Sequence, residues 1–146
     1  MKKITLIFIC IITLGLAGCS SEQYSHDAEG LPEKAQNTIS QYFDSAISLV
    51  KKDKETFSGT EYNVVLTNGC EITFEGNGDW KNIETPNNLA VPSALIPPTL
   101  AEFVKSHHAG ASIVGIEIIK KGYEVELSNG VEIQFNKDGG FIQYDK

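Results

Sequence analysis

One segment of the chain occurs twice. Residues 62–80 read YNVVLTNGCEITFEGNGDW, and residues 123–141 read YEVELSNGVEIQFNKDGGF. At a constant offset of 61, nine of the nineteen aligned positions are identical. Such an internal repeat constrains the architecture strongly, because both copies must build the same supersecondary unit.

The first residues have the organisation of a secretory signal peptide. Lys2 and Lys3 precede an apolar run, residues 4–16, which is too short to span about 30 Å of hydrocarbon at about 1.5 Å per residue. The segment LAGC that ends at Cys19 resembles the lipobox of bacterial lipoproteins. That resemblance implies cleavage before Cys19 and acylation of its sulfur and amino group. Cys19 is therefore the predicted lipidation site, and an ordinary secretory signal with an accidental cysteine is the rejected alternative.

The predicted location is the cell envelope, where the acyl chains on Cys19 would anchor the protein to a membrane. Ser20 and Ser21 carry no acidic inner-membrane retention signal of the enterobacterial kind, which favours the outer membrane. The leaflet, periplasmic or surface, stays open.

Charge and cysteine content narrow the possible partners. Loss of Lys2 and Lys3 with the signal leaves ten lysines, no arginine and nineteen acidic residues, a net charge of −9. An acidic, arginine-free surface repels phosphate backbones, so we expect no nucleic-acid partner. Cys10 leaves with the signal and Cys19 is acylated, so Cys70 has no partner for a disulfide. The domain must be stable through its core alone.

The chain divides into five predicted parts. A short helix is expected at the start of each repeat, with Leu31, Ala35 and Ile39 forming the apolar stripe of the first. A strand follows each helix, with alternation at Ile47 and Leu49 in one copy and at Val114, Ile116 and Ile118 in the other. The parts are a signal peptide (1–18), the lipidated cysteine with a flexible tether (19–30), repeat one (31–84), a linker (85–95) and repeat two (96–146).

The repeated segment predicts a hairpin whose loop length can be decided. A two-residue Asn129-Gly130 turn would place half of the apolar side chains on the solvent face. A three-residue loop with glycine in the left-handed region places all of them on one face. The predicted pairs are Leu127 with Val131, Val125 with Ile133 and Tyr123 with Phe135, and in the other copy Leu66 with Cys70, Val64 with Ile72 and Tyr62 with Phe74.

A second tight loop follows in each copy and adds a fourth strand. It pairs Trp80 with Phe74 in one copy and Phe141 with Phe135 in the other. The predicted fold class is α+β: two tandem repeats, each a helix plus four antiparallel strands, form a curved sheet with both helices on one face.

The opposite face of this sheet is polar and rich in glutamate. A solvated face is ordinary for an antiparallel sheet, and an acidic docking surface for a basic partner is the functional alternative. The candidate partner-binding residues are Glu71, Thr73, Glu124, Glu126, Glu132, Gln134 and, as the clearest aromatic anchor, Tyr144.

Catalytic and metal chemistry find little support in the sequence. No serine lies in a nucleophile-elbow context, and Cys70 aligns with Val131, which predicts a buried side chain. The adjacent His107 and His108 diverge by about 100° on a helix, so they cannot easily share one tetrahedral ion. We therefore expect no enzyme, no metal site and no cofactor.

A family resemblance rests on the same residues. Leu31-Pro32 at the helix start, the pattern Tyr-x-Val-x-Leu-x-Asn-Gly-x-Glu-Ile-x-Phe at 62–74 and 123–135, and the turn that follows it resemble the PepSY-like domain, also called β-lactamase-inhibitor-like. The resemblance covers residues 31–145 and implies a non-catalytic envelope lipoprotein that binds a protein partner, such as an inhibitor or modulator of an envelope enzyme. The runner-up is a binding module for a small molecule or glycan at the groove between the repeats.

Overall fold

The computed structural model describes residues 22–55, 59–86 and 88–145. Within these ranges no helix is long and apolar enough to cross a membrane. The elements in chain order are β1 (Gln23–Ser25), α1 (Glu33–Tyr42), β2 (Ile47–Glu55), β3 (Gly59–Leu66), β4 (Glu71–Glu75), β5 (Trp80–Glu84), the 3₁₀ turn η1 (Ser93–Leu95), α2 (Pro98–His107), β6 (Ile113–Ile119), β7 (Gly122–Leu127), β8 (Glu132–Asn136) and β9 (Phe141–Asp145).

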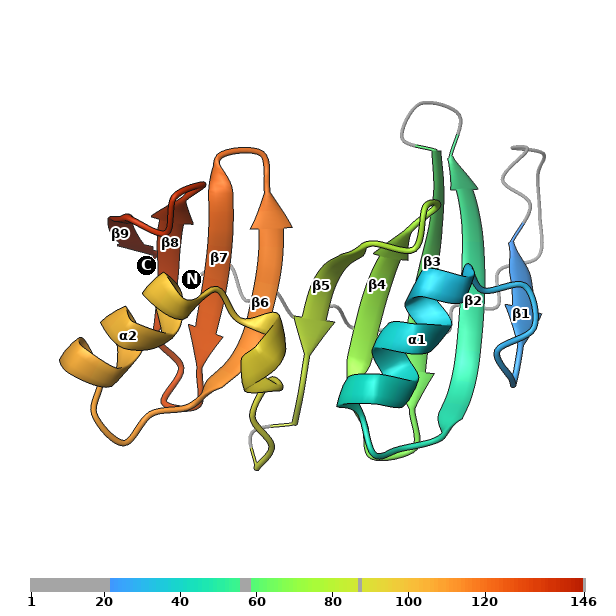
Figure 1. Ribbon diagram of the computed structural model, residues 1–146, viewed down its shortest axis with the longest axis horizontal. Helices are drawn as coiled ribbons and strands as arrows, with labels where there is room; N and C mark the ends of the chain where they lie inside the picture. The colour runs from blue at the N-terminus through green and yellow to red at the C-terminus, as the bar shows by residue number, and fades with distance from the viewer. Residues whose placement is uncertain (1–21, 56–58, 87, 146) are drawn as a thin grey trace, which may run out of the picture.

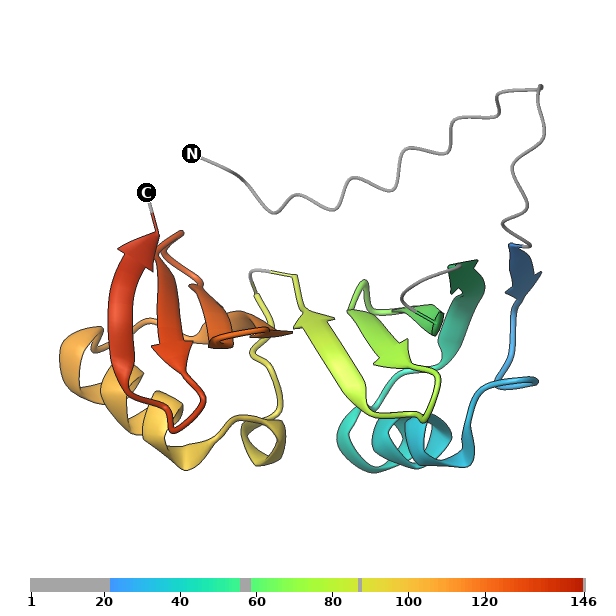
Figure 2. The ribbon, with the colours of Figure 1, turned by 90° about the horizontal axis from the view of Figure 1, so that it is seen from above.

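All nine strands belong to one antiparallel sheet, in the order in which they occur in the chain (Figure 1). The two halves join where β5 pairs with β6, with Ile83 opposite Ile116. Both helices lie on the same side of the sheet, so in the part of the chain that the structure describes no helix covers the other side (Figure 2).

The predicted fold class is wrong. The structure is a single nine-stranded sheet with only two α-helices in the described residues, not two units of a helix plus four strands. The additional strand, β1, comes from the segment that was expected to be a flexible tether. It pairs with β2, with Tyr24 opposite Lys51, and so satisfies backbone groups that would otherwise form an open sheet edge.

The predicted hairpin geometry is confirmed in both copies. The Leu127 amide donates to the Val131 carbonyl (2.9 Å), and Gly130 has a φ of 81°, as the three-residue loop requires. The register then places Val125 opposite Ile133 and Tyr123 opposite Phe135. In the other copy the Leu66 amide donates to the Cys70 carbonyl (2.8 Å), and the second loops pair Phe74 with Trp80 and Phe135 with Phe141.

The core lies between the helices and the sheet. The predicted stripe of α1 is buried, as is Cys70, and α2 contributes Leu100 and Val104. Full burial of an aliphatic or Phe side chain contributes about 1.5–3 kcal/mol, so these contacts fix the helices on one face. The fully buried large side chains are Phe74, Phe135, Leu66, Ile72, Ile83, Leu100, Ile116, Leu127, Ile133, Val64 and Val125.

Two bulges change the strands that follow the helices. The register shifts between Ile47 and Leu49 in β2 and between Ile113 and Gly115 in β6. A bulge inserts one extra residue and so reverses the alternation beyond it. Val50 therefore enters the core at 3% exposure, and Ile113, opposite Leu127, does so at 6%. Ile118 stays on the same side as the buried Ile116, opposite Tyr123, and is 41% exposed near the end of β6.

Two hairpin glycines allow a test of how the loops hold the helices. Both Gly78 and Gly130 have positive φ, but a Cβ on Gly78 would lie 2.9 Å from the Cβ of Pro32, whereas a Cβ on Gly130 would meet nothing within 4 Å. We expect Gly130→Ala to lower the free energy of unfolding by about 1–2 kcal/mol, through backbone strain alone. Gly78→Ala should cost about 1–3 kcal/mol more, because it also displaces α1. Urea denaturation followed by circular dichroism measures both, and equal losses would show that the loop does not support the helix.

Candidate protein-binding face

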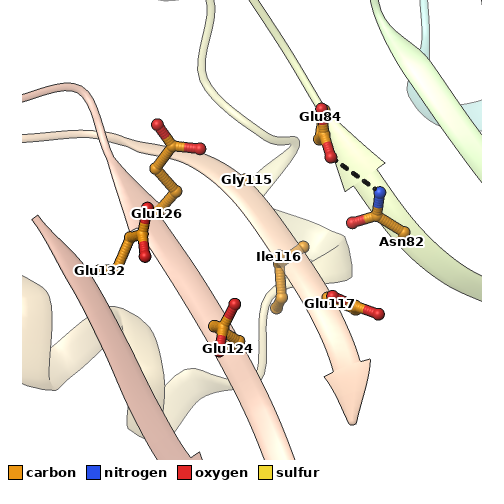
Figure 3. Close-up of a pocket in the computed structure, with 8 residues that line it drawn as sticks. All are labelled: Asn82, Glu84, Gly115, Ile116, Glu117, Glu124, Glu126 and Glu132. Atoms are coloured by element: carbon orange, nitrogen blue, oxygen red, sulfur yellow. Dashed lines mark hydrogen bonds between the residues drawn. The ribbon is translucent and has the colours of Figure 1, made fainter. Parts of the chain in front are cut away.

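The uncovered side of the sheet carries a group of six glutamates from five adjacent strands. Each is half-buried and alternates along its strand with core residues such as Ile72, Ile83, Ile116, Val125 and Ile133. We call this group the acidic face: Glu71, Glu84, Glu117, Glu124, Glu126 and Glu132. Five of the six line one shallow depression (Figure 3).

The glutamates of the acidic face are placed directly opposite one another. Strand register pairs Glu71 with Glu84, Glu117 with Glu124 and Glu126 with Glu132. Like charges in directly opposite positions destabilise a sheet, so three such pairs on one face are not explained by stability.

Little positive charge compensates these carboxylates. Among the described residues, the ion pairs on this side of the molecule join Lys81 to Glu61 (2.7 Å) and Lys51 to Glu22 and Asp53 (3.0 and 3.1 Å). None of them includes a member of the acidic face. Two members accept hydrogen bonds from neutral amides instead: Glu84 from Asn82 and Glu124 from Gln134, each at 3.0 Å.

Burial and mutual repulsion act on the same carboxyls. Burial raises the pKa of Glu126 above its ordinary value, and the negative charges of Glu132 and Glu84 raise it further. The pKa of Glu71 is raised by burial and then by Glu84, and that of Glu132 by burial and then by Glu124 and Asp145. The pKa of Glu117 is raised by burial and by Glu124, with Lys81 acting in the opposite direction. The face thus holds its negative charge against a free-energy cost.

The depression in the acidic face is too small for a sugar ring. It forms where Gly115 lies opposite Glu126, and its volume of about 20 Å³ admits about one water molecule. A larger concavity of about 540 Å³ lies on the helix side, between α2 and residues 90–96, and is lined mostly by Ala, Val and Ile side chains. Its lining contains few polar groups that converge on one point, so it does not specify a ligand.

Six of the seven predicted partner-binding residues lie together on the uncovered side: Glu71, Thr73, Glu124, Glu126, Glu132 and Gln134. One of the six, Thr73, donates a hydrogen bond from its hydroxyl to the side-chain oxygen of Asn63 (2.9 Å). Tyr144 lies on the other side, because it is opposite the buried Ile133, and its hydroxyl is 3.1 Å from Nε2 of His108. Cys19 lies outside the described residues.

Sequence reasoning missed Glu84 and Glu117. Their alternation with Ile83 and Ile116 was visible, but the pairing of β5 with β6 was not. Only that pairing brings the two residues between Glu71 and Glu124, at the centre of the acidic face.

Cys70 and the possible metal ligands can be placed in the described part of the structure. The Cys70 side chain is 2% exposed, and burial raises the pKa of its thiol. No group of three or more His, Cys, Asp or Glu side chains in the described ranges is placed to hold a metal ion. His107 Nδ1 is 3.0 Å from the Phe103 carbonyl, whereas His108 contacts Tyr144, so the two rings have different partners.

Comparison with known proteins agrees with this description. The family described as "Putative beta-lactamase-inhibitor-like, PepSY-like" matches residues 60–143. The class defined by the fold and its open face is therefore a PepSY-like domain. The chain belongs to this PepSY-like family.

Three solved structures are similar to the chain. One, from Bacteroides vulgatus, is described as a putative periplasmic protein of unknown function; it is 33% identical, with a TM-score of 0.82, and covers 86% of this chain and 100% of its own. One from Bacteroides thetaiotaomicron, described as a putative calcium-regulated periplasmic protein, is 31% identical, with a TM-score of 0.79 over 86% of this chain and 97% of its own. Another from Bacteroides vulgatus, described as a putative periplasmic protein, is 31% identical, with a TM-score of 0.79; the match covers 88% of this chain and 100% of the other. No curated protein matches the chain. The periplasmic descriptions agree with the predicted cell-envelope location.

The raised pKa values predict an unusual dependence of stability on pH. A carboxyl whose pKa is higher in the folded state binds more protons there than in the unfolded chain, so stability falls as pH rises through that range. We expect the free energy of unfolding to increase when pH is lowered from 7.5 towards the ordinary glutamate value of 4.5. Below that value, the ion-paired Asp79 and Glu22, whose pKa values are lowered, lose their contribution.

Glu126→Gln should flatten this dependence and raise stability at pH 7.5 by up to about 1 kcal/mol, because it removes one like-charge pair. Urea titrations across the pH range measure the effect, with Glu102→Gln on the exposed side of α2 as the matched control. A wild-type profile in Glu126→Gln would mean that the opposed glutamates do not repel significantly.

Proposed function

We propose that this chain is a non-catalytic cell-envelope lipoprotein whose acidic face binds a basic surface of a protein partner and so modulates that partner, an envelope enzyme being the class we favour. The observation that carries the proposal is the set of three directly opposed glutamate pairs within the acidic face. In the described structure none of them includes an ion-paired carboxylate, unlike the pair of Glu61 with Glu75 on the same side, where Glu61 is joined to Lys81. A carboxylate pair of this kind costs about 0.2–1 kcal/mol relative to a neutral pair. Because these pairs lower the stability of the free protein, we infer that they serve binding rather than folding.

A basic partner surface satisfies the same carboxylates that destabilise the free protein. Lysine or arginine side chains placed between Glu126 and Glu132, and between Glu117 and Glu124, would replace repulsion with attraction. The side chains stand on strands in the middle of the sheet, so binding requires little ordering of the backbone. The concentrated negative field also accelerates encounter with a positively charged partner.

Family and location support this function. The family is described as inhibitor-like, and the similar structures are described as periplasmic, which is where a partner enzyme would be met. One relative is described as calcium-regulated. Divalent cations screen carboxylates, so we propose that calcium weakens partner binding by this chain rather than filling a dedicated site.

Charge reversal on the acidic face tests the function. The triple variant Glu124→Lys, Glu126→Lys, Glu132→Lys should lose at least about tenfold in partner capture, because the basic surface then meets like charge. The measurement is affinity capture from envelope extract with the tagged chain, quantified by mass spectrometry with calcium and with a chelator.

The matched control carries the same charge change elsewhere. Glu29, Glu33 and Glu102 are exposed and lie outside the acidic face, so their replacement by lysine should leave capture unchanged. Equal capture by both triple variants and the wild type would eliminate the acidic face as the binding surface.

The lipid anchor is tested separately. Cys19→Ala removes the thiol that would accept the acyl chains, so the protein should move from the membrane fraction to the soluble fraction of a cell lysate. Immunoblotting after ultracentrifugation gives the distribution. Cys70→Ala serves as the control and should stay with the membrane, and membrane retention of Cys19→Ala would refute lipidation.

A further inference from the structure

One edge of the sheet is open and apolar. Strand β9 lies at the end of the sheet, and no strand in the described part of the chain pairs with its outer side (Figure 1). Its Phe141, Ile142 and Tyr144 side chains are 44%, 44% and 45% exposed. Exposed edges with large apolar side chains are sites where a further strand can add, and proteins normally protect them.

The first half of the protein shows what the equivalent of β9 looks like when a further strand pairs with it. Strand β5 occupies the same place in its half as β9 does in the other, because Ile72 is opposite Ile83 and Ile133 is opposite Tyr144. The outer side of β5 is taken by β6, which pairs Ile83 with Ile116 and leaves Ile83 0% exposed. Its equivalent, Tyr144, lacks such a covering strand in the described structure.

The backbone of β9 is oriented to accept a strand. The Asn136 amide donates to the Gly140 carbonyl (2.8 Å), so alternate residues of β8, including Gln134, direct their backbone groups towards β9. Gln134 is opposite Gln143, whose backbone groups therefore face β8. Successive residues of an antiparallel strand face alternate sides, so the Tyr144 N–H and C=O point to the open edge.

The two sides of the edge differ in chemistry and so specify the incoming strand. On the helix side Phe141 stacks on Phe103, with ring centroids 5.2 Å apart, and Tyr144 lies next to it, which favours apolar side chains. On the other side Gln143 and Asp145 extend the rows that begin with Glu124 and Glu126, which favours lysine or arginine. A second copy fits less well, since β9 carries Asp145 and no lysine or arginine, so pairing β9 with itself brings no positive charge to the acidic side.

We propose that an extended segment of the protein partner, with alternating apolar and basic residues, pairs with β9 as an additional antiparallel strand. This inference rests on the proposed function and gives it a location and a register. The backbone hydrogen bonds hold the segment, its apolar side chains cover Phe141 and Tyr144, and its basic side chains extend onto the acidic face.

The probe is a blocked synthetic peptide in which lysine alternates with valine, and its reference is a peptide of the same composition with lysines and valines in separate blocks. Binding to the full domain is measured by isothermal titration calorimetry. We expect the alternating peptide to bind at least about tenfold more tightly than the block peptide. Tyr144→Pro, which removes an outward N–H, should weaken the alternating peptide about tenfold.

Controls separate the edge from the rest of the molecule. Tyr24→Pro makes the same change in β1 at the opposite edge and should leave binding unchanged. Because proline at position 144 also removes a side chain that packs on the edge, hydrogen exchange of the wild-type protein by NMR provides an independent readout. The amide of Tyr144 should gain protection when the alternating peptide is added.

The outcomes distinguish this inference from the proposed function. One outcome is that the charge-reversal variant of Glu124, Glu126 and Glu132 loses binding, while Tyr144 gains no protection and Tyr144→Pro has no effect. That outcome overturns strand addition at β9 but agrees with binding to the acidic face. Binding of neither peptide, or binding of the alternating peptide that Tyr144→Pro does not weaken, overturns the edge, whereas the proposed function is decided by partner capture with the charge-reversal variant. A peptide-free dimer in sedimentation velocity that Tyr144→Pro dissociates would make a second copy the occupant and overturn the partner segment.

Discussion

The pairing of β5 with β6 determines most of what this molecule can present to its surroundings. Ile83 and Ile116 lie opposite each other at 0% and 1% exposure, so the junction between the halves is packed as tightly as either core. Without it, Glu71 and Glu124 would belong to two separate sheets. With it, Glu84 and Glu117 fill the space between them, and one uninterrupted face crosses five strands. Both helices lie on the other side of the sheet, so no helix of the described residues covers this face (Figure 2).

Local sequence signals were sufficient for the parts of the fold that depend on one turn. The two Asn-Gly loops each had only one length that put Val125 and Ile133, or Val64 and Ile72, on the same face, and that length is observed. The helix stripes of Leu31, Ala35 and Ile39 likewise followed from their spacing. These predictions are correct because each concerns residues that are close together in the chain, where local propensity and burial favour the same structure.

The features that sequence reasoning missed are those decided by partners distant in the chain. Gln23–Ser25 has no apolar alternation and reads as a polar tether, yet β2 offers it an unpaired edge. The bulges in β2 and β6 leave no signature in composition, and they place Val50 and Ile113 in the core. Tyr144 was placed on the wrong side for the same kind of reason, since the register shift between Gln134 and Phe135 resets the alternation of β9.

The differences between the two sequence copies locate specificity in one half of the face. At the positions equivalent to the acidic face, the first copy pairs Asn63 with Thr73, a neutral pair joined by a 2.9 Å hydrogen bond, and Val65 with Glu71. Its own opposed pair, Glu61 with Glu75, lies further along the strands, and there Glu61 is ion-paired with Lys81. The second copy pairs Glu124 with Gln134 and Glu126 with Glu132. The backbone register is the same in both, so the carboxylates of Glu124 and Glu126, which stand where the first copy has Asn63 and Val65, serve neither the hairpin nor the core. Glu124 and Glu126 both lie on β7, so β9 and β8 separate them from a segment bound at the open edge, and Asp145 and Glu132 continue the row of Glu126 across those two strands. The acidic side chains and the free backbone edge are thus close enough to act on one partner.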